Sequence, residues 1–248
     1  MTYRTKMKKV FFSFLIIIAA FHADAQNDTT NVYSSTVSKE DYKDDWADLH
    51  HYQATNKQLG VPAAGEKRVV FLGSSIFERW ADVAPEFFSN KNYVNRGISG
   101  QISPQLLIRF RQDVIDLNPS AVVILAGSND IAVSTGHVTN ATIMDNIKSM
   151  SELAKAHGIK VIICAYLPVF DYPWRKGLQP ANKIIALNKD IKAYVNKEGF
   201  TLLDYFSPFA DERNGQKKEL TLDGVHPNAA GYGVMAKITE DAIAKALR

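Results

Sequence analysis

The chain has 248 residues, of which 46% are hydrophobic and 22% are charged, and its formal net charge is +3. These ordinary values argue against a disordered or a collagen-like protein. A single cysteine excludes an internal disulfide, and its place in an apolar run predicts that Cys164 is a buried, unreactive thiol.

The first 25 residues have the three parts of a secretory signal peptide. A basic start is followed by an apolar run over residues 10–21 and by Ala23-Asp24-Ala25, where small residues suit a signal peptidase. The run is shorter than the roughly 20 residues of a membrane-spanning helix, and no cysteine for lipid attachment follows it. We therefore predict cleavage near Ala25 and export to the periplasm or beyond, without a stable membrane anchor. An uncleaved anchor is the alternative.

Cleavage would also change the charge of the protein. It removes four of the 29 basic residues and one of the 26 acidic residues, which leaves 25 of each. A nucleic-acid-binding protein needs a basic face, so nucleic acid is not an expected partner of this neutral chain.

Residues 26–66 are expected to form a tail, a helix and a linker. The tail, up to about residue 37, is polar and predicted to be disordered. A candidate cap at Ser38, followed by large apolar residues such as Trp46 at helical spacing, predicts an amphipathic helix over 39–58. A Val-Pro-Ala-Ala-Gly stretch is then typical of a linker.

From Lys67 to the C-terminus, short apolar runs alternate with helical patterns. The runs lie at 69–72, 93–94, 121–126, 159–165 and 200–203. Strands separated by helices favour parallel pairing with right-handed crossovers, and uninterrupted apolar strands favour helices on both faces of the sheet. We predict one domain over residues 67–248, a three-layer α/β/α sandwich of flavodoxin-like type with about five parallel strands.

Small polar residues follow each of the first three predicted strands. These turns are Gly73-Ser74-Ser75, residues 95–100 and residues 127–130. In a parallel sheet all three emerge at one edge, where ligands bind. Each turn alone is equally well explained by the turn-forming tendency of Gly, Ser, Asn and Asp. Three of them at one edge predict a functional site there.

Asp223 and His226 lie three positions apart on the loop before the last predicted helix. The carboxylate of such a pair can hold one imidazole nitrogen while the other nitrogen faces a nucleophile. Ser75, at a strand-to-helix turn, is the hydroxyl that this pair requires, and helix N–H groups beside it can face an oxyanion. Two alternatives stay open: a histidine that only bonds to backbone, and a metal site, although no third ligand stands at a recognisable spacing.

These four blocks together resemble the SGNH hydrolases, also called GDSL esterases and lipases, and especially their secreted bacterial lysophospholipase-like and acetylhydrolase-like members. The resemblance implies that Ser75 is the nucleophile, His226 the general base and Asp223 its orienting partner. It implies an oxyanion hole formed by backbone N–H groups of Ser75 and Gly100 and by the side chain of Asn129. It implies neither a metal nor an organic cofactor.

The first block departs from the family pattern, which usually has Gly-Asp-Ser where this chain has Gly73-Ser74-Ser75. The departure keeps the nucleophile but replaces an aspartate that helps to hold the site. A non-catalytic ligand-binding module on the same fold is therefore an alternative to an active hydrolase.

The expected reaction is hydrolysis of a carboxylic ester through an acyl-Ser75 intermediate. Tyr172 and Trp174, after the fourth predicted strand, are candidates to stack on a sugar ring or to face an acyl chain; the alternative is that they only pack their loop. We expect a small-molecule or glycan ester as substrate, with short acyl groups such as acetyl favoured over lysophospholipids. An acyltransferase with the same triad stays open, and the oligomeric state is not predicted.

Overall fold

The computed structural model describes residues 45–89, 92–132 and 138–248. The predicted signal peptide, the polar tail and the first residues of the predicted helix over 39–58 lie outside the described residues. Asp45–Arg248 form one compact unit.

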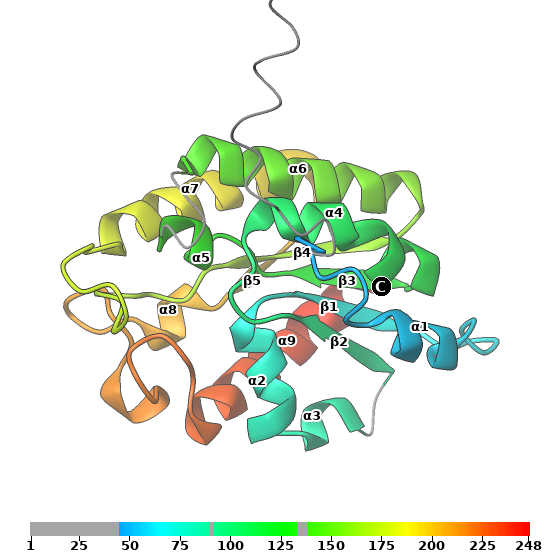
Figure 1. Ribbon diagram of the computed structural model, residues 1–248, viewed down its shortest axis with the longest axis horizontal. Helices are drawn as coiled ribbons and strands as arrows, with labels where there is room; N and C mark the ends of the chain where they lie inside the picture. The colour runs from blue at the N-terminus through cyan, green and yellow to red at the C-terminus, as the bar shows by residue number, and fades with distance from the viewer. Residues whose placement is uncertain (1–44, 90–91, 133–137) are drawn as a thin grey trace, which may run out of the picture. The chain divides into compact units, whose positions relative to one another are not determined.

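Five parallel strands form one sheet in the order β2-β1-β3-β4-β5 (Figure 1), which confirms the predicted fold class. The order reverses between β1 and β3, and open sheets bind their ligands at such a switch point, beyond the carboxyl ends of the strands. The strands are β1 (Val69–Gly73), β2 (Tyr93–Gly97), β3 (Ala121–Ile124), β4 (Lys160–Ala165) and β5 (Thr201–Asp204).

Helices cover both faces of the sheet. On one face lie α4 (Ser103–Asp113), α6 (Asn140–Ala156) and α7 (Ala181–Glu198); on the other lie α2 (Ser75–Val83), α3 (Glu86–Ser89) and α9 (Ala229–Ala246) (Figure 1). The shorter helical segments are α1 (Gln53–Leu59), α5 (Ser128–Ile131), α8 (Phe206–Phe209), η1 (Ile115–Leu117) and η2 (Lys218–Leu220).

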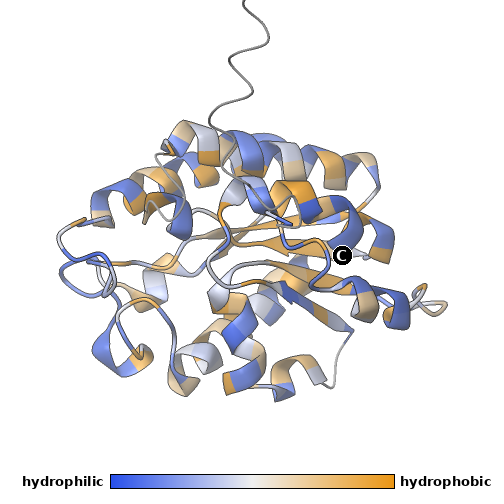
Figure 2. Cartoon of the chain, in the orientation of Figure 1, coloured by the Kyte–Doolittle hydropathy of each residue, from blue (hydrophilic) through white to orange (hydrophobic). Residues whose placement is uncertain are grey.

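The central strands are buried on both faces because the helices cover them. All residues of β1 and β3 are buried, and Figure 2 shows hydrophobic residues along the centre of the sheet. On the α2 side an aromatic cluster forms part of the core, where Trp80 stacks on Phe87 at 4.2 Å between ring centres and on Tyr232 at 5.4 Å. Cys164 is 1% exposed, and burial raises the pKa of its thiol, as expected for an unreactive cysteine.

The predicted helix over 39–58 is confirmed at 53–58 but wrong at 45–52, because residues 45–52 form turns and α1 begins only at Gln53. The Asp45 carboxylate accepts the backbone N–H of His50 at 2.8 Å, and Asp48 has a left-handed φ of 55°. Side-chain hydrogen bonds of aspartate thus compete here with a helix. The predicted turn at 95–100 also begins later, since β2 continues to Gly97.

In the part of the chain that the structure describes, no helix is long and apolar enough to cross a membrane.

Candidate active site

Ser75, His226 and Asp223 form a hydrogen-bonded series at the carboxyl edge of the sheet. The Ser75 Oγ lies 3.0 Å from the His226 Nε2, and the His226 Nδ1 lies 2.8 Å from the Asp223 Oδ2. His226 is 6% exposed, whereas Ser75 is half-buried. Both ring nitrogens of His226 are engaged in these contacts, so the geometry favours proton transfer over metal ligation.

The serine is placed by the end of β1 and the start of α2. Ser75 is the first residue of this helix, and the Ser74 carbonyl accepts the N–H groups of Phe77 and Glu78. The N–H groups at the start of a helix have no partner within the helix and can bind a negative charge. The hydroxyl of Tyr232 on α9 donates to the Ile76 carbonyl at 2.8 Å and thereby links the helix after His226 to the helix that begins at Ser75.

The loop of Asp223 and His226 is held by its own hydrogen bonds. The Thr221 hydroxyl donates to the His226 carbonyl at 2.9 Å and accepts the N–H of Gly224, whose φ of 86° suits glycine. The side chain of Gln216 donates to the Val225 carbonyl at 2.7 Å. The histidine therefore reaches Ser75 from a fixed backbone.

The Asp223 carboxylate has the charge that an orienting partner needs. Partial burial acts to raise the pKa of Asp223, but hydrogen bonds from the His226 N–H, the His226 ring and the Val225 N–H outweigh it. The pKa of Asp223 therefore lies below its ordinary value. An ionised carboxylate at neutral pH stabilises the imidazolium that would form in a proton transfer.

Gly100 lies in the loop after β2, and its φ of 79° is the left-handed conformation that favours glycine. The Glu78 carboxylate on α2 accepts the N–H of Ser99 at 3.0 Å, which fixes the residue before Gly100 to the helix of Ser75. The base of this loop approaches the helix closely, since a Cβ at Gly97 would lie 2.3 Å from the Glu78 nitrogen.

Asn129 comes from α5, directly after β3, and its side-chain Nδ2 donates to the Gln101 carbonyl at 2.9 Å. An amide nitrogen has two hydrogens, so one is left for a ligand. The neighbouring Asp130 is buried and accepts the N–H and the hydroxyl of Ser103, the first residue of α4. Burial raises the pKa of Asp130, and the bonds from Ser103 oppose that shift.

Arg109 on α4 is fully buried beneath the site and was not among the predicted functional residues. It forms an ion pair with Asp113 at 3.0 Å and donates to the carbonyls of Gly73 and Arg96, at the ends of β1 and β2. Burial lowers the pKa of Arg109, and the charge of Asp113 opposes this. The sequence did contain a signal for this pair. Arg109 and Asp113 are four positions apart on one helix, next to the apolar residue Phe110.

The two predicted aromatic contacts have different outcomes. Tyr172 is fully buried, and its hydroxyl donates to the Ser128 carbonyl at 3.0 Å, so its ring offers no surface to a substrate and that expectation is wrong. Trp174 is 53% exposed, and its ring centre lies 5.9 Å from that of His226. Tyr172 packs against Trp174 at 5.2 Å and supports it from below.

Ser74, where the family usually has aspartate, is 5% exposed. Among the described residues its hydroxyl makes no hydrogen bond to a side chain, whereas its carbonyl caps α2. The network around Ser75 is instead made by Glu78, Arg109 and Tyr232.

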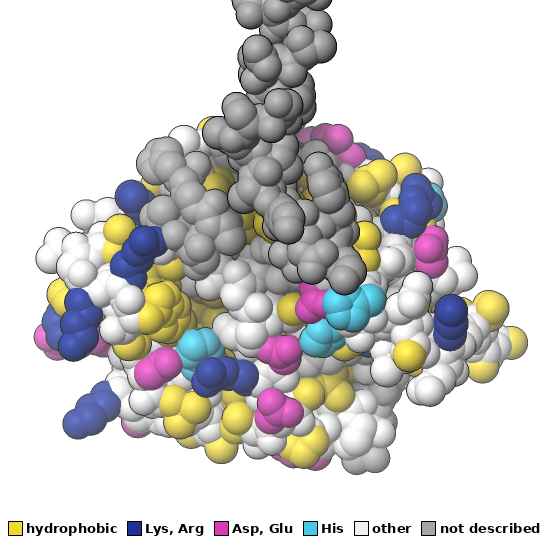
Figure 3. Space-filling view, viewed as in Figure 1, with side chains coloured by type: hydrophobic (Ala, Val, Ile, Leu, Met, Phe, Trp, Pro, Cys, Tyr) yellow, Lys and Arg dark blue, Asp and Glu magenta, His cyan; other side chains and the backbone are white. Residues whose placement is uncertain are grey.

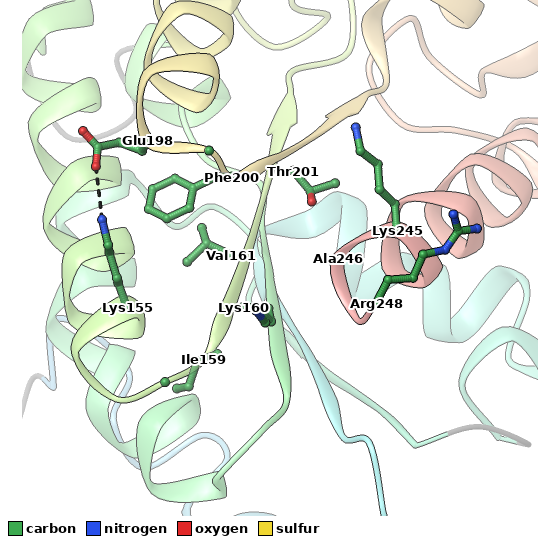
Figure 4. Close-up of a pocket in the computed structure, with 12 residues that line it drawn as sticks. Lys155, Ile159, Lys160, Val161, Glu198, Phe200, Thr201, Lys245, Ala246 and Arg248 are labelled. Atoms are coloured by element: carbon green, nitrogen blue, oxygen red, sulfur yellow. Dashed lines mark hydrogen bonds and ion pairs between the residues drawn. The ribbon is translucent and has the colours of Figure 1, made fainter.

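The face of the molecule that carries this edge shows histidine, acidic and hydrophobic side chains close together (Figure 3). A separate cleft of about 520 Å³ lies at the opposite edge, where β4 and β5 begin (Figure 4). Lysines line much of it, and Lys155 pairs with Glu198 at 3.4 Å. Asp45, Asp48 and His50 are the one group in the described residues with three metal-ligating atoms within 4.8 Å, but their hydrogen bonds to one another account for that geometry.

A doubly wound parallel sheet whose switch point holds a serine within hydrogen-bond distance of a carboxylate-oriented histidine has the architecture of a serine hydrolase. Residues 64–234 match the model of the GDSL-like lipase/acylhydrolase family, and the chain belongs to this family of ester hydrolases. The membership that the sequence motifs predicted is confirmed.

Solved structures agree with this assignment. A predicted acylhydrolase of Bacteroides fragilis is 44% identical, with a TM-score of 0.81 over 82% of this chain and 99% of its own. A GDSL-like lipase of Bacteroides thetaiotaomicron is 43% identical, with a TM-score of 0.80 over 82% of this chain and 100% of its own. An uncharacterized lipoprotein of Bacillus subtilis is 32% identical over 85 residues, which span 33% of this chain and 35% of the lipoprotein.

Proposed function

We propose that this protein is a serine esterase that cleaves carboxylic esters through an acyl-Ser75 intermediate. The observation that carries the proposal is the series of contacts from Ser75 Oγ to His226 at 3.0 Å and on to Asp223 at 2.8 Å. Nucleophile and base are within the distance at which a proton passes between them.

In the first step the His226 Nε2 accepts the proton of Ser75 as the serine oxygen attacks the ester carbonyl. The N–H groups of Ser75 and Gly100 and the free amide hydrogen of Asn129 hold the developing oxyanion. His226 then gives its proton to the leaving alcohol, and the acyl group stays on Ser75. Asp223 keeps the imidazole in the required orientation throughout.

Water completes the reaction by the same route. His226 accepts a proton from water, the hydroxyl attacks the acyl-Ser75 carbonyl, and the Ser75 oxygen leaves with the proton from His226. No group other than these side chains and backbone N–H groups is required, so the proposal includes neither a metal nor an organic cofactor.

The substrate that we propose is a small-molecule or glycan ester with a short acyl group such as acetyl. Exposed Trp174, 5.9 Å from the His226 ring, offers an aromatic face beside the reacting atoms on which a sugar ring can stack. A lysophospholipid is the second candidate, because the same face can contact an alkyl chain. An acyltransferase with a sugar acceptor would use the same intermediate.

We also propose that the chain is exported and cleaved near Ala25. The basic start, the apolar run and the small residues at 23–25 support this, and the partly matching relative from Bacillus subtilis is itself a lipoprotein.

The experiment that tests the function is hydrolysis of p-nitrophenyl esters from acetate to palmitate by the protein that begins at Gln26. We expect the highest kcat/KM for acetate or butyrate and a steep fall for longer chains. Preference for palmitate would favour the lipid alternative. An absence of turnover on every ester, together with saturable binding of acetylated sugars, would support the non-catalytic module.

Trp174→Ala is expected to raise KM for an acetylated oligosaccharide about tenfold, since a lost aromatic stack of about 1.4 kcal/mol has that effect. The kcat value should change little, because Trp174 makes no hydrogen bond in the Ser75–His226–Asp223 series. The matched control is Phe170→Ala on the same loop, whose ring is 42% exposed and packs under Arg213 instead. Equal KM values for the two variants would exclude Trp174 from the sugar contact.

A further inference from the structure

The segment 45–59, which we call the N-terminal segment, is bonded to α4 and the loop before it by three glutamines. Gln101, Gln105 and Gln112 donate their side-chain amides to the carbonyls of Ala47, Trp46 and Leu49, respectively. The segment precedes the part of the chain that matches the family, which starts at residue 64.

Gln101 differs from the other two glutamines because it lies next to Gly100 and joins three partners. Its side-chain nitrogen donates to the Ala47 carbonyl at 2.8 Å, and its side-chain oxygen accepts the Nε of Arg109 at 2.6 Å. Its backbone carbonyl accepts the Asn129 amide at 2.9 Å. The residue is 6% exposed, so water does not replace these bonds easily.

Two of the proposed oxyanion donors therefore depend on one residue. Gly100, whose N–H is one proposed donor, immediately precedes Gln101 in the chain. The side-chain amide of Asn129, the other donor, forms a hydrogen bond to the Gln101 carbonyl. We propose that Gln101 is a positioning residue of the oxyanion hole, through which the N-terminal segment and Arg109 fix the directions of both donors. This inference rests on the proposed esterase function.

Gln101 can hold the two oxyanion donors in place because its side chain is bonded both to Arg109 and to the N-terminal segment. Arg109 is itself held by Asp113 and by the carbonyls at the ends of β1 and β2, so it ties Gln101 to the sheet. Ala47 is 3% exposed and ties Gln101 to the N-terminal segment. Oxyanion donors act by being held in place before charge develops, so a small displacement of Gln101 lowers the rate rather than substrate binding.

Gln101→Ala is expected to lower kcat about 10- to 100-fold with little change in KM, somewhat less than the effect of removing one donor outright. The inhibition constant of phenylboronic acid should rise by the same factor, because the tetrahedral adduct of this inhibitor with serine places an oxygen in the oxyanion hole. Gln101→Glu keeps an acceptor for Arg109 but loses the donor to Ala47. Its kcat should fall between those of Gln101→Ala and the unchanged protein.

Gln112→Ala is the matched control, since it removes a bond to the N-terminal segment at Leu49 and leaves the bonds of Gln101 in place. Its kcat and phenylboronic acid inhibition should stay within about twofold of the unchanged protein, a difference of about 0.4 kcal/mol. All assays are run well below the thermal midpoint of each variant. If Gln101→Ala does not fold, the proposal is tested by comparing the kcat of Gln101→Glu with the kcat of Gln112→Ala.

Two results would overturn the inference: equal kcat in the Gln101 variants and Gln112→Ala, or a lower kcat without weaker phenylboronic acid inhibition. Failure of the esterase proposal is seen separately, as absence of turnover in the unchanged protein.

Discussion

Alanine at Ser75 or at His226 is expected to lower kcat by about 10⁶-fold, the effect of removing the nucleophile or the base of a serine hydrolase. The reason is the 3.0 Å contact between Ser75 Oγ and His226 Nε2, which lets the histidine remove the serine proton as the oxygen attacks. The measurement is steady-state hydrolysis of p-nitrophenyl acetate. Circular dichroism first checks that each variant is folded.

The double variant is the internal control. If two residues act as a unit, removing the second one lowers kcat no further than removing the first. Ser75→Ala with His226→Ala should be no slower than either single variant, and Asp223→Asn alone should cost about 10⁴-fold. Turnover that survives Ser75→Ala would show that another group attacks the ester and would exclude the acyl-Ser75 intermediate.

Arg109→Met is expected to lower the free energy of unfolding by about 3–5 kcal/mol, the cost of removing one partner of a buried ion pair. Methionine leaves the fully buried Asp113 without its counter-charge and the Gly73 and Arg96 carbonyls without this donor. Urea denaturation followed by tryptophan fluorescence measures the change.

The control for Arg109 is Lys148→Met, which breaks an exposed ion pair with Asp145 and should cost less than about 1 kcal/mol. A second variant, Arg109→Met with Asp113→Leu, should recover part of the loss because it removes the buried charge as well. An Arg109→Met protein as stable as Lys148→Met would show that the buried pair does not hold the ends of β1 and β2 together.

Most of the fold was predictable because apolar runs mark the central strands β1, β3 and β4, and helical patterns separate the strands along the chain. The juxtaposition of Ser75 and His226 followed from topology, since turns after parallel strands share one edge. The contact of Asp223 with His226 was predictable because the two residues are three positions apart on one loop.

The supports of the site were not predictable, because they depend on contacts between distant parts of the chain. Arg109 is a charged residue that local pattern places on a helix, and only its four acceptors explain its burial. Tyr172 and Trp174 differ in exposure because the Tyr172 hydroxyl has a buried partner in Ser128. The contact of Gln101 with Ala47 joins residues 54 positions apart.

Ser75 and His226 are 151 positions apart, and β2, β3, β4 and β5 all lie between them in the chain. The last helix, α9, must dock beside α2 before the two side chains can meet. A chain in which β2 to β5 and α9 are not yet in place therefore lacks the contact between Ser75 and His226. Under the proposed function, ester turnover requires the fold from β1 to α9, which makes it a direct assay of folding yield for any variant with an intact site.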